Sequence, residues 1–227
     1  MSYKALTINW SLAAVMAVFS IAGAQWLGFG FPFVHMLYLS VAIAGIQIFA
    51  FTVKAFNVRD GYFAFMLLQQ LLLILTGSIL CQLLLYLGAA LAFPLIDEKL
   101  IAADRLFGFD WMAFFLWVTH YPWLMTLFNI CYDSFIPQVA FLLWLLALTR
   151  RAAEMDRFVL AYIATLIITI VIATLLPAVG AYLHYQLDPA QYGVRPTAAT
   201  LHAKDFLALR SHELTHFPFI MKGLVTF

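Results

Sequence analysis

The longest apolar run of the chain, Tyr62 to Phe93, reads YFAFMLLQQLLLILTGSILCQLLLYLGAALAF and contains no charged residue. A membrane's hydrocarbon core is about 30 Å thick and needs about 20 consecutive apolar residues of helix to cross it. Because this run exceeds that length, we expect a transmembrane helix that tilts or projects from the bilayer.

The composition of the whole chain is that of an integral membrane protein. Of 227 residues, 65% are hydrophobic and 10% are charged, whereas soluble domains are about 45–50% apolar and about 25% charged. The net charge of +1 shows no basic or acidic excess of the kind that points to nucleic acid. Cys81 and Cys131 lie in apolar runs without a partner motif, which favours buried thiols over a disulfide or a metal pair.

Five apolar runs are long enough to cross a bilayer. They are Ile8 to Gly28, Val34 to Val53, Tyr62 to Phe93, a run within Tyr121 to Leu148, and Phe158 to Leu183. No internal repeat or second domain is visible. We therefore expect residues 1–227 to form one all-α membrane domain, a polytopic bundle of about five transmembrane helices.

Positively charged residues in short loops indicate the orientation, because such loops stay in the cytoplasm. Lys54 and Arg59 follow the second run, and Arg150, Arg151 and Arg157 separate the fourth run from the fifth. The N-terminus is therefore expected to be cytoplasmic, in a bacterial inner membrane. Residues 94–120 and the tail 184–227 are expected on the extracytoplasmic side.

The segment PLIDEKLIAADRLFGFDW, which begins at Pro94, has the pattern of an amphipathic helix at the membrane interface. Ile96, Leu100, Ala103 and Phe107 share one helical face, and Asp97, Glu98, Asp104 and Arg105 share the other. Gly108 is expected to end this helix, and Asp110 is expected to cap a following helix that begins at Trp111.

Polar residues within the apolar runs are candidates for function, because an unpaired charge in a membrane is costly. Asp133, in NICYDSFIPQ, has two equally favoured interpretations, a functional acid and a helix cap formed with Ser134 and Pro137. Gln69, Gln70 and Gln82 favour interhelical hydrogen bonds over a conduit. Pro177 is expected to kink the fifth helix.

The tail segment SHELTHFPF, Ser211 to Phe219, contains the His-Glu-x-x-His motif of zinc proteases. We expect a helix from about Thr200 to Leu214, on which His212 and His216 would share a face beside Glu213. A zinc site needs a third ligand, for which His184 and His202 are the candidates upstream. No residue that could be the third ligand follows His216, and Pro218 interrupts the helix. We therefore expect no metal site. A zinc-dependent membrane protease ranks third among the functions considered.

The same tail is rich in cationic and imidazole groups, namely Arg195, His202, Lys204, Arg210, His212, His216 and Lys222. Such groups bind phosphate through charge-assisted hydrogen bonds. Attraction to anionic lipid head groups explains the charge equally well.

Several blocks occur in an order that resembles a known family. They are PLIDEKLIAADRLFGFDW, YDSFIPQVAFLLWLLALTRR, LLPAVGAYLHY, HAKDFLALRSHEL and GLVTF. From about Pro94 onward the chain resembles the bacterial inositol phosphorylceramide synthase-like (inositolphosphotransferase) branch of the phosphatidic acid phosphatase type 2 superfamily. The resemblance implies a multi-helix membrane enzyme that cleaves or transfers lipid phosphoesters without a metal or another cofactor.

The resemblance also implies a chemistry that this sequence carries only in part. In the family, a nucleophilic His forms a phosphohistidine, an Asp orients it, a second His protonates the leaving group, and Lys or Arg side chains hold the phosphate. The family's GLVTF continues into Pro-Ser-Phe-His and later a Gly-Gly-His block, whereas this chain stops at Phe227. No catalytic residue is therefore carried over.

Only the phosphate-holding residues of the family have counterparts here. Arg210 matches as the substrate-binding arginine, and Lys204 is a looser candidate because its spacing to Arg210 differs by one residue. We expect a C-terminally truncated lipid phosphatase or phosphotransferase, inactive by itself, whose partners are the bilayer and a lipid phosphate. The alternative is a non-enzymatic membrane subunit or remnant.

Overall fold

The structure is a computed structural model that describes residues 4–30, 33–56, 61–188, 192 and 203–217. Its long helices are α1 (Lys4–Leu27), α2 (Phe33–Ala55), α3 (Gly61–Ala90) and α8 (Ala152–Leu175). The remaining described helices are α4 (Asp97–Leu106), α5 (Trp111–Thr119), α6 (Pro122–Asp133), α7 (Phe135–Leu148), α9 (Ala181–His184) and α12 (Ala203–Arg210).

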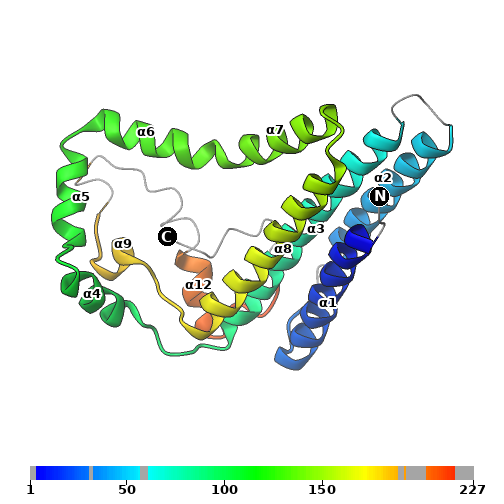
Figure 1. Ribbon diagram of the computed structural model, residues 1–227. Helices are drawn as coiled ribbons and strands as arrows, with labels where there is room; N and C mark the ends of the chain where they lie inside the picture. Colours follow the sequence, from blue (N-terminus) through cyan, green and yellow to red (C-terminus); the bar gives the residue numbers. More distant parts are fainter. Residues whose placement is uncertain (1–3, 31–32, 57–60, 189–191, 193–202, 218–227) are drawn as a thin grey trace.

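Helix α3 forms the centre of the bundle. It packs against α1, α2, α7, α8 and α12, and its side chains supply much of the main hydrophobic core (Figure 1). A 30-residue helix is about 45 Å long, which exceeds the hydrocarbon thickness and agrees with the predicted long helix. Gly88 lets α8 approach closely, since a Cβ atom at this position would meet the Thr174 side chain.

The membrane-spanning character predicted from the sequence is confirmed. Among the described residues, α1 from Ala5, α3 and α8 are each long and apolar enough to cross a membrane. Helices α6 and α7 meet the criterion together, with a bend of 43° between them, and the stretch Ser40–Ala55 of α2 is apolar but shorter. The protein is an all-helical membrane bundle, and the count of five spans stays a prediction.

The fifth expected run has different boundaries from those predicted. Helix α8 begins at Ala152, six residues before Phe158, and ends at Leu175 instead of Leu183. Pro177 therefore lies beyond the helix and does not kink it. Its carbonyl oxygen instead accepts a hydrogen bond from the backbone N–H of Ile96, at 3.0 Å.

Because α8 begins earlier than predicted, Asp156 lies inside the bundle and not in the loop expected before Phe158. Asp156 is buried, and its Oδ1 atom accepts a 2.6 Å hydrogen bond from the Gln70 amide. The Asn9 amide donates to the Asp156 carbonyl oxygen at 3.2 Å. Gln69 accepts from the Trp10 indole at 3.1 Å and donates to Gln47 at 2.6 Å, so interhelical bonding is confirmed for Gln69 and Gln70.

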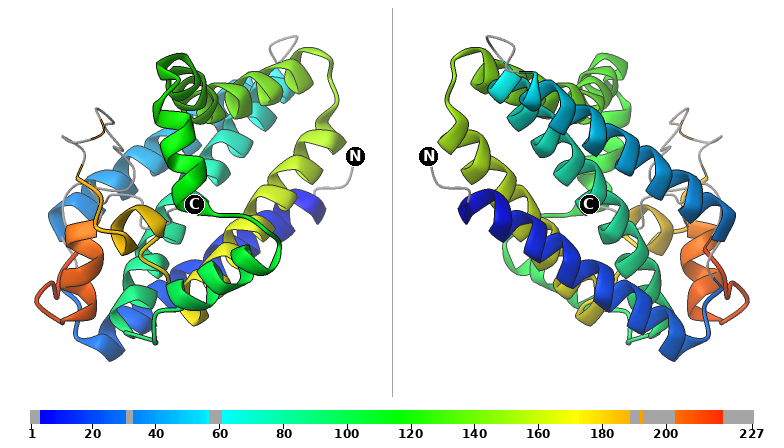
Figure 2. Two further views of the ribbon diagram at one scale, coloured as in Figure 1. Left: turned by 90° about the vertical axis from the view of Figure 1, so that its left-hand side faces the viewer. Right: turned by 90° about the vertical axis from the view of Figure 1, so that its right-hand side faces the viewer.

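The fourth expected run consists of the bent pair α6 and α7, which meet at Ser134 (Figures 1 and 2). The Ser134 hydroxyl donates to the Cys131 carbonyl at 2.7 Å and accepts from the Gln138 amide at 2.6 Å. Asp133 is exposed at the end of α6, and no side-chain cap bond is formed at this junction. The capping interpretation of Asp133 is therefore wrong.

The helix signals between the third and fourth runs are confirmed. Gly108 has a φ of +75°, and its N–H bonds the Arg105 carbonyl at the end of α4. Asp110 caps α5, because its Oδ1 atom accepts from the Ala113 N–H at 3.0 Å. Phe107 is 89% exposed, whereas Asp97 is buried instead of facing water. The interfacial position of this helix stays a prediction.

The two ends of the bundle are expected on opposite sides of the membrane. Arg151 precedes α8, whereas α12 lies at the other end of α8 (Figure 1). Reporter fusions placed after Arg151 and after Arg210 should therefore report cytoplasmic and extracytoplasmic locations, respectively. Finding both fusions in one compartment would contradict this topology.

Candidate functional site

The candidate site lies where α12 packs against the end of α3 (Figures 1 and 2). Phe206 and Leu209 are the buried residues of α12 and hold the helix on the core. This packing places Arg210, the last residue of α12, beside the connection from α3 to α4. The Arg210 Nη2 atom donates a 2.8 Å hydrogen bond to the carbonyl oxygen of Phe93.

The Arg210 guanidinium retains donor capacity after this bond. Its Nη1 atom is buried and has no hydrogen-bond partner among the described residues. Burial lowers the pKa of Arg210 from its ordinary value, and the nearby Asp97 carboxylate opposes this shift. An arginine in such a setting keeps its charge and has an unsatisfied N–H group to offer to an anion.

Asp97 organises the segment on the other side of the site. One carboxylate oxygen accepts from the Val179 N–H at 3.1 Å, and the other accepts from the Gly180 N–H at 3.0 Å. Gly180 has a φ of +85° and a ψ of 151°, a conformation almost restricted to glycine. Asp97 therefore ties the start of α4 to the turn that follows α8.

A cavity of about 310 Å³ opens beside this connection. Its lining combines the carboxylates of Asp97 and Asp104 with Trp111 and the segment 178–182. The Trp111 ring stacks between Phe115 and Tyr185, at centroid distances of 5.2 and 5.7 Å. Burial raises the pKa of the neighbouring Tyr182 phenol, and its hydroxyl has no partner among the described residues. The cavity is thus a partly polar hollow lined by Asp97, whose carboxylate also influences Arg210 electrostatically.

The His-Glu-x-x-His segment is not helical. The prediction of a helix that extends to Leu214 is therefore wrong. Helix α12 ends at Arg210, and His212 has a left-handed φ of +58°. The Glu213 N–H bonds back to the Ala208 carbonyl and the His212 N–H to the Leu209 carbonyl, which together form a Schellman ending. His212 and His216 therefore do not share a helical face, and the predicted start near Thr200 lies outside the described residues.

The chain after this turn pairs with the loop that follows α1. The Gly30 N–H donates to the Thr215 carbonyl at 2.9 Å, and the Phe217 N–H donates to the Gly30 carbonyl at 3.3 Å. The Phe217 ring packs against Phe29 with a centroid distance of 5.3 Å. These contacts hold the segment in place. In the part of the chain that is described, His, Cys, Asp and Glu form no metal-binding group of three or more.

The structure separates the predicted site residues instead of gathering them. Lys204 is exposed, and it is about 120° around α12 from Arg210, since six residues separate them. His184 packs against the Tyr185 ring at 5.4 Å. Arg195, His202 and Lys222 lie outside the described residues. Sequence reasoning missed Asp97 because its place on the polar face of α4 suggested exposure to water.

The structure thus combines an all-helical membrane bundle with a half-buried arginine and a partly polar cavity at the same end. A family model described as the PAP2 superfamily matches residues 98–224, which is more than half of the chain. The chain therefore belongs to the PAP2 superfamily, as its resemblance predicted. Comparisons with curated proteins and with solved structures found no match.

We predict that Asp97→Asn lowers the stability of the protein. An amide has one acceptor oxygen instead of two, and its NH₂ group would face a backbone N–H. Loss of one buried, charge-assisted bond costs about 1–3 kcal/mol, which should appear as a lower unfolding temperature in detergent. Asp104→Asn is the matched control, since no hydrogen bond involves the Asp104 carboxylate among the described residues. Equal stability of the two variants would contradict a structural role of Asp97.

We also predict that the purified protein contains less than stoichiometric zinc, because two histidines outside a helix do not complete a tetrahedral site. Elemental analysis of the protein, purified without chelator, measures the metal content. One tightly held zinc per chain, lost on His212→Ala or His216→Ala, would contradict this expectation and support a protease.

Proposed function

We propose that this chain is the membrane-embedded, substrate-binding part of a lipid phosphatase or phosphotransferase of the metal-independent phosphohistidine type. In this proposal residues 1–227 form one membrane domain, with 94–120 and 184–227 on the extracytoplasmic side. Membership of the PAP2 superfamily supports the class of reaction. The order of the blocks from Pro94 onward favours the inositol phosphorylceramide synthase-like branch.

The observation that carries the proposal is the geometry of Arg210. A guanidinium bound through Nη2 to the Phe93 carbonyl is held in one orientation, while Nη1 has no partner among the described residues. A phosphate oxygen is a strong acceptor for such a donor, particularly where water is excluded. We therefore assign Arg210 to the lipid phosphate and the cavity beside Asp97 to the group that the phosphate carries.

Lys204 contributes less to binding in this proposal. Its side chain is exposed and lies on a different face of α12. An exposed ammonium attracts a phosphate from a distance but is screened by water and salt. The substrate is a phospholipid or lipid phosphate that approaches Arg210 from the extracytoplasmic leaflet.

The resemblance assigns the making and breaking of the phosphoester bond to two histidine blocks. The family's Pro-Ser-Phe-His and Gly-Gly-His blocks do not occur in the 227 residues. Residues that act as a unit in covalent catalysis cannot be replaced by binding groups alone. The chain is therefore proposed to bind substrate without turning it over, which also leaves the non-enzymatic subunit or remnant as the alternative.

We predict that the 227-residue chain does not hydrolyse or transfer lipid phosphate above background. A longer natural form that carries both histidine blocks should act on a phospholipid or lipid phosphate in the presence of a chelator. In that form, Arg210→Ala should lower kcat roughly 100-fold, since one oriented donor to the developing charge is worth about this much. Lys204→Ala is the comparison and should lower kcat less than about 10-fold.

Phosphate release from a defined phosphatidic acid substrate in mixed micelles measures both variants. Robust activity of the 227-residue chain that survives further purification would show that the catalytic residues are misplaced. If Lys204→Ala instead proves the more damaging change, the assignment of Arg210 to the phosphate is wrong. If no longer natural form exists, the remnant alternative is favoured.

A further inference from the structure

Three polar side chains meet in the interior of the bundle, where α1, α3 and α8 pack together. They are Asn9 of α1, Gln70 of α3 and Asp156 of α8, and their exposed fractions are 0%, 0% and 4%. Each lies in the first half of its helix, whereas Arg210 lies where α12 packs against the end of α3. We call these three residues the Asp156 cluster, and it takes no part in the proposed function.

Apolar side chains surround the Asp156 cluster. On α3, Met66 and Leu73 lie about one turn before and one turn after Gln70, and both are buried. On α8, Val159 lies about one turn after Asp156 and is also buried. All three apolar residues belong to the main hydrophobic core. A charge at this place is therefore poorly solvated.

The hydrogen bonds within the cluster use the amide nitrogens as donors. Gln70 Nε2 donates to Asp156 Oδ1 at 2.6 Å, and Asn9 Nδ2 donates to the Asp156 carbonyl oxygen at 3.2 Å. The amide oxygens Asn9 Oδ1 and Gln70 Oε1 are buried and have no hydrogen-bond partner among the described residues. Buried polar atoms in proteins nearly always have a partner. Two such oxygens beside one carboxylate therefore favour the binding of an electropositive group.

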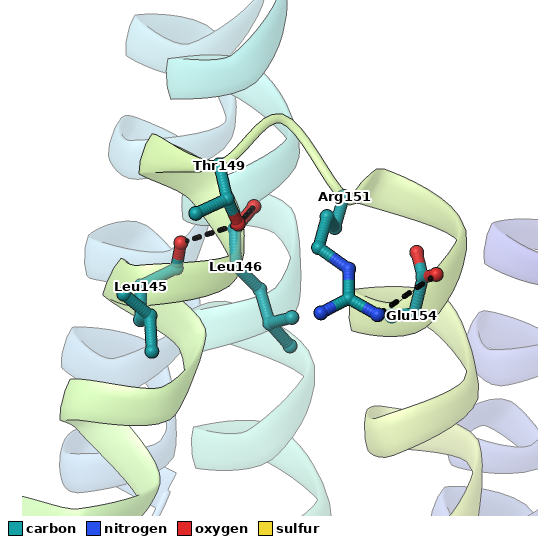
Figure 3. Close-up of polar contacts among 5 residues, drawn as sticks. All are labelled: Leu145, Leu146, Thr149, Arg151 and Glu154. Carbon is teal, nitrogen blue, oxygen red and sulfur yellow. Dashed lines mark hydrogen bonds and ion pairs between the residues drawn. The ribbon is translucent and has the colours of Figure 1, made fainter.

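The Asp156 carboxylate forms no ion pair in the part of the chain that the structure describes. The adjacent Arg157 is exposed. Arg151, which precedes α8, pairs instead with Glu154 at 3.4 Å (Figure 3). An unpaired carboxylate inside a membrane bundle is costly, and buried charges in proteins are usually paired or bind metal ions.

We propose that the Asp156 cluster binds one monovalent metal cation, with the Asp156 carboxylate and the amide oxygens of Asn9 and Gln70 as ligands. Carboxylate and amide oxygens are the usual ligands of hard cations. One positive charge neutralises the single carboxylate, whereas a divalent ion would leave an uncompensated charge in apolar surroundings.

Two other occupants fit the cluster less well. A water molecule could donate to both amide oxygens, but it would leave the charge of Asp156 unneutralised. A proton would neutralise Asp156, but a carboxylic acid has a single O–H donor and could serve only one of the two oxygens. A metal ion supplies the charge and is coordinated by several oxygens at once.

The bound cation would link α1, α3 and α8, because each of these helices supplies one ligand residue. An ion that binds the folded chain and not the unfolded chain stabilises the fold in proportion to the logarithm of its concentration. This effect does not involve Arg210 or a lipid substrate. Failure of this proposal therefore leaves the proposed function unaffected, and the converse also holds.

The test measures the unfolding temperature of the full chain in neutral detergent, at pH 8 and constant ionic strength. Sodium chloride or potassium chloride replaces choline chloride, whose quaternary ammonium ion is too large for three converging oxygens. At least one of the metal salts should raise the unfolding temperature by about 3–6 °C for each tenfold rise in its concentration above the dissociation constant.

Three variants locate the effect. Asp156→Asn should abolish the response, and in choline chloride it should unfold at or above the temperature of the unmodified protein, because no unpaired charge is then buried. Asn9→Leu removes one ligand oxygen and should raise the salt concentration of the half-maximal response at least roughly tenfold, since even outer-shell partners are worth about this much. Glu154→Gln is the matched control. It removes a carboxylate that pairs with Arg151 at the start of α8 and should leave the response unchanged.

Several outcomes would overturn the proposal. Equal unfolding temperatures in sodium, potassium and choline chloride at every concentration would show that no metal ion binds. A response that survives Asp156→Asn, or that Glu154→Gln abolishes equally, would place its origin outside the cluster. A larger effect of calcium chloride than of either monovalent salt would show a divalent site. Stabilisation at lower pH that is the same in all three salts would show that a proton neutralises Asp156.

Discussion

The hydrogen bonds from the Val179 and Gly180 N–H groups to the Asp97 carboxylate are the contact on which the α12 end of the bundle depends. They join the start of α4 to the turn after α8, segments more than eighty positions apart in the chain. The Ile96 N–H bond to the Pro177 carbonyl runs beside them. Arg210 then meets this end of the bundle through the Phe93 carbonyl. A carboxylate satisfied by backbone donors tolerates burial, which an unpaired charge does not.

A related constraint governs the interior of the bundle. Polar side chains inside a membrane need hydrogen-bond partners on neighbouring helices. Gln70 meets this requirement through Asp156, and Gln69 meets it through Trp10 and Gln47. These bonds link α3 to α8, α1 and α2, respectively, at fixed points along the helices. Gly88 adds a close approach to α8. Apolar packing alone would allow such helices to slide, whereas paired polar groups favour one arrangement.

The two ends of the molecule present arginines in different ways. Arg210 is half-buried at the end of α12, next to a carboxylate and a partly polar cavity. Arg150 is exposed, in a left-handed turn beside an apolar groove. Arg210 is the last residue of α12, and Arg150 lies two residues after the end of α7, so both arginines stand at a helix ending. Membership of the PAP2 superfamily bears on the first of these ends, because the matched residues 98–224 include α12.

The sequence by itself determined the class of fold, the helix signals at Gly108 and Asp110, and the superfamily, because apolar run length, capping chemistry and block order are local properties. Tertiary structure alone decided the burial of Asp97 and Asp156, since their donors come from distant segments. Tertiary structure also ended α12 at Arg210. The left-handed conformation of His212 and the pairing of residues 215–217 with Gly30 stand where the His-Glu-x-x-His spacing predicted a helix. Helical spacing predicts a shared face only while the helix continues, and contacts remote in sequence decide where this one stops.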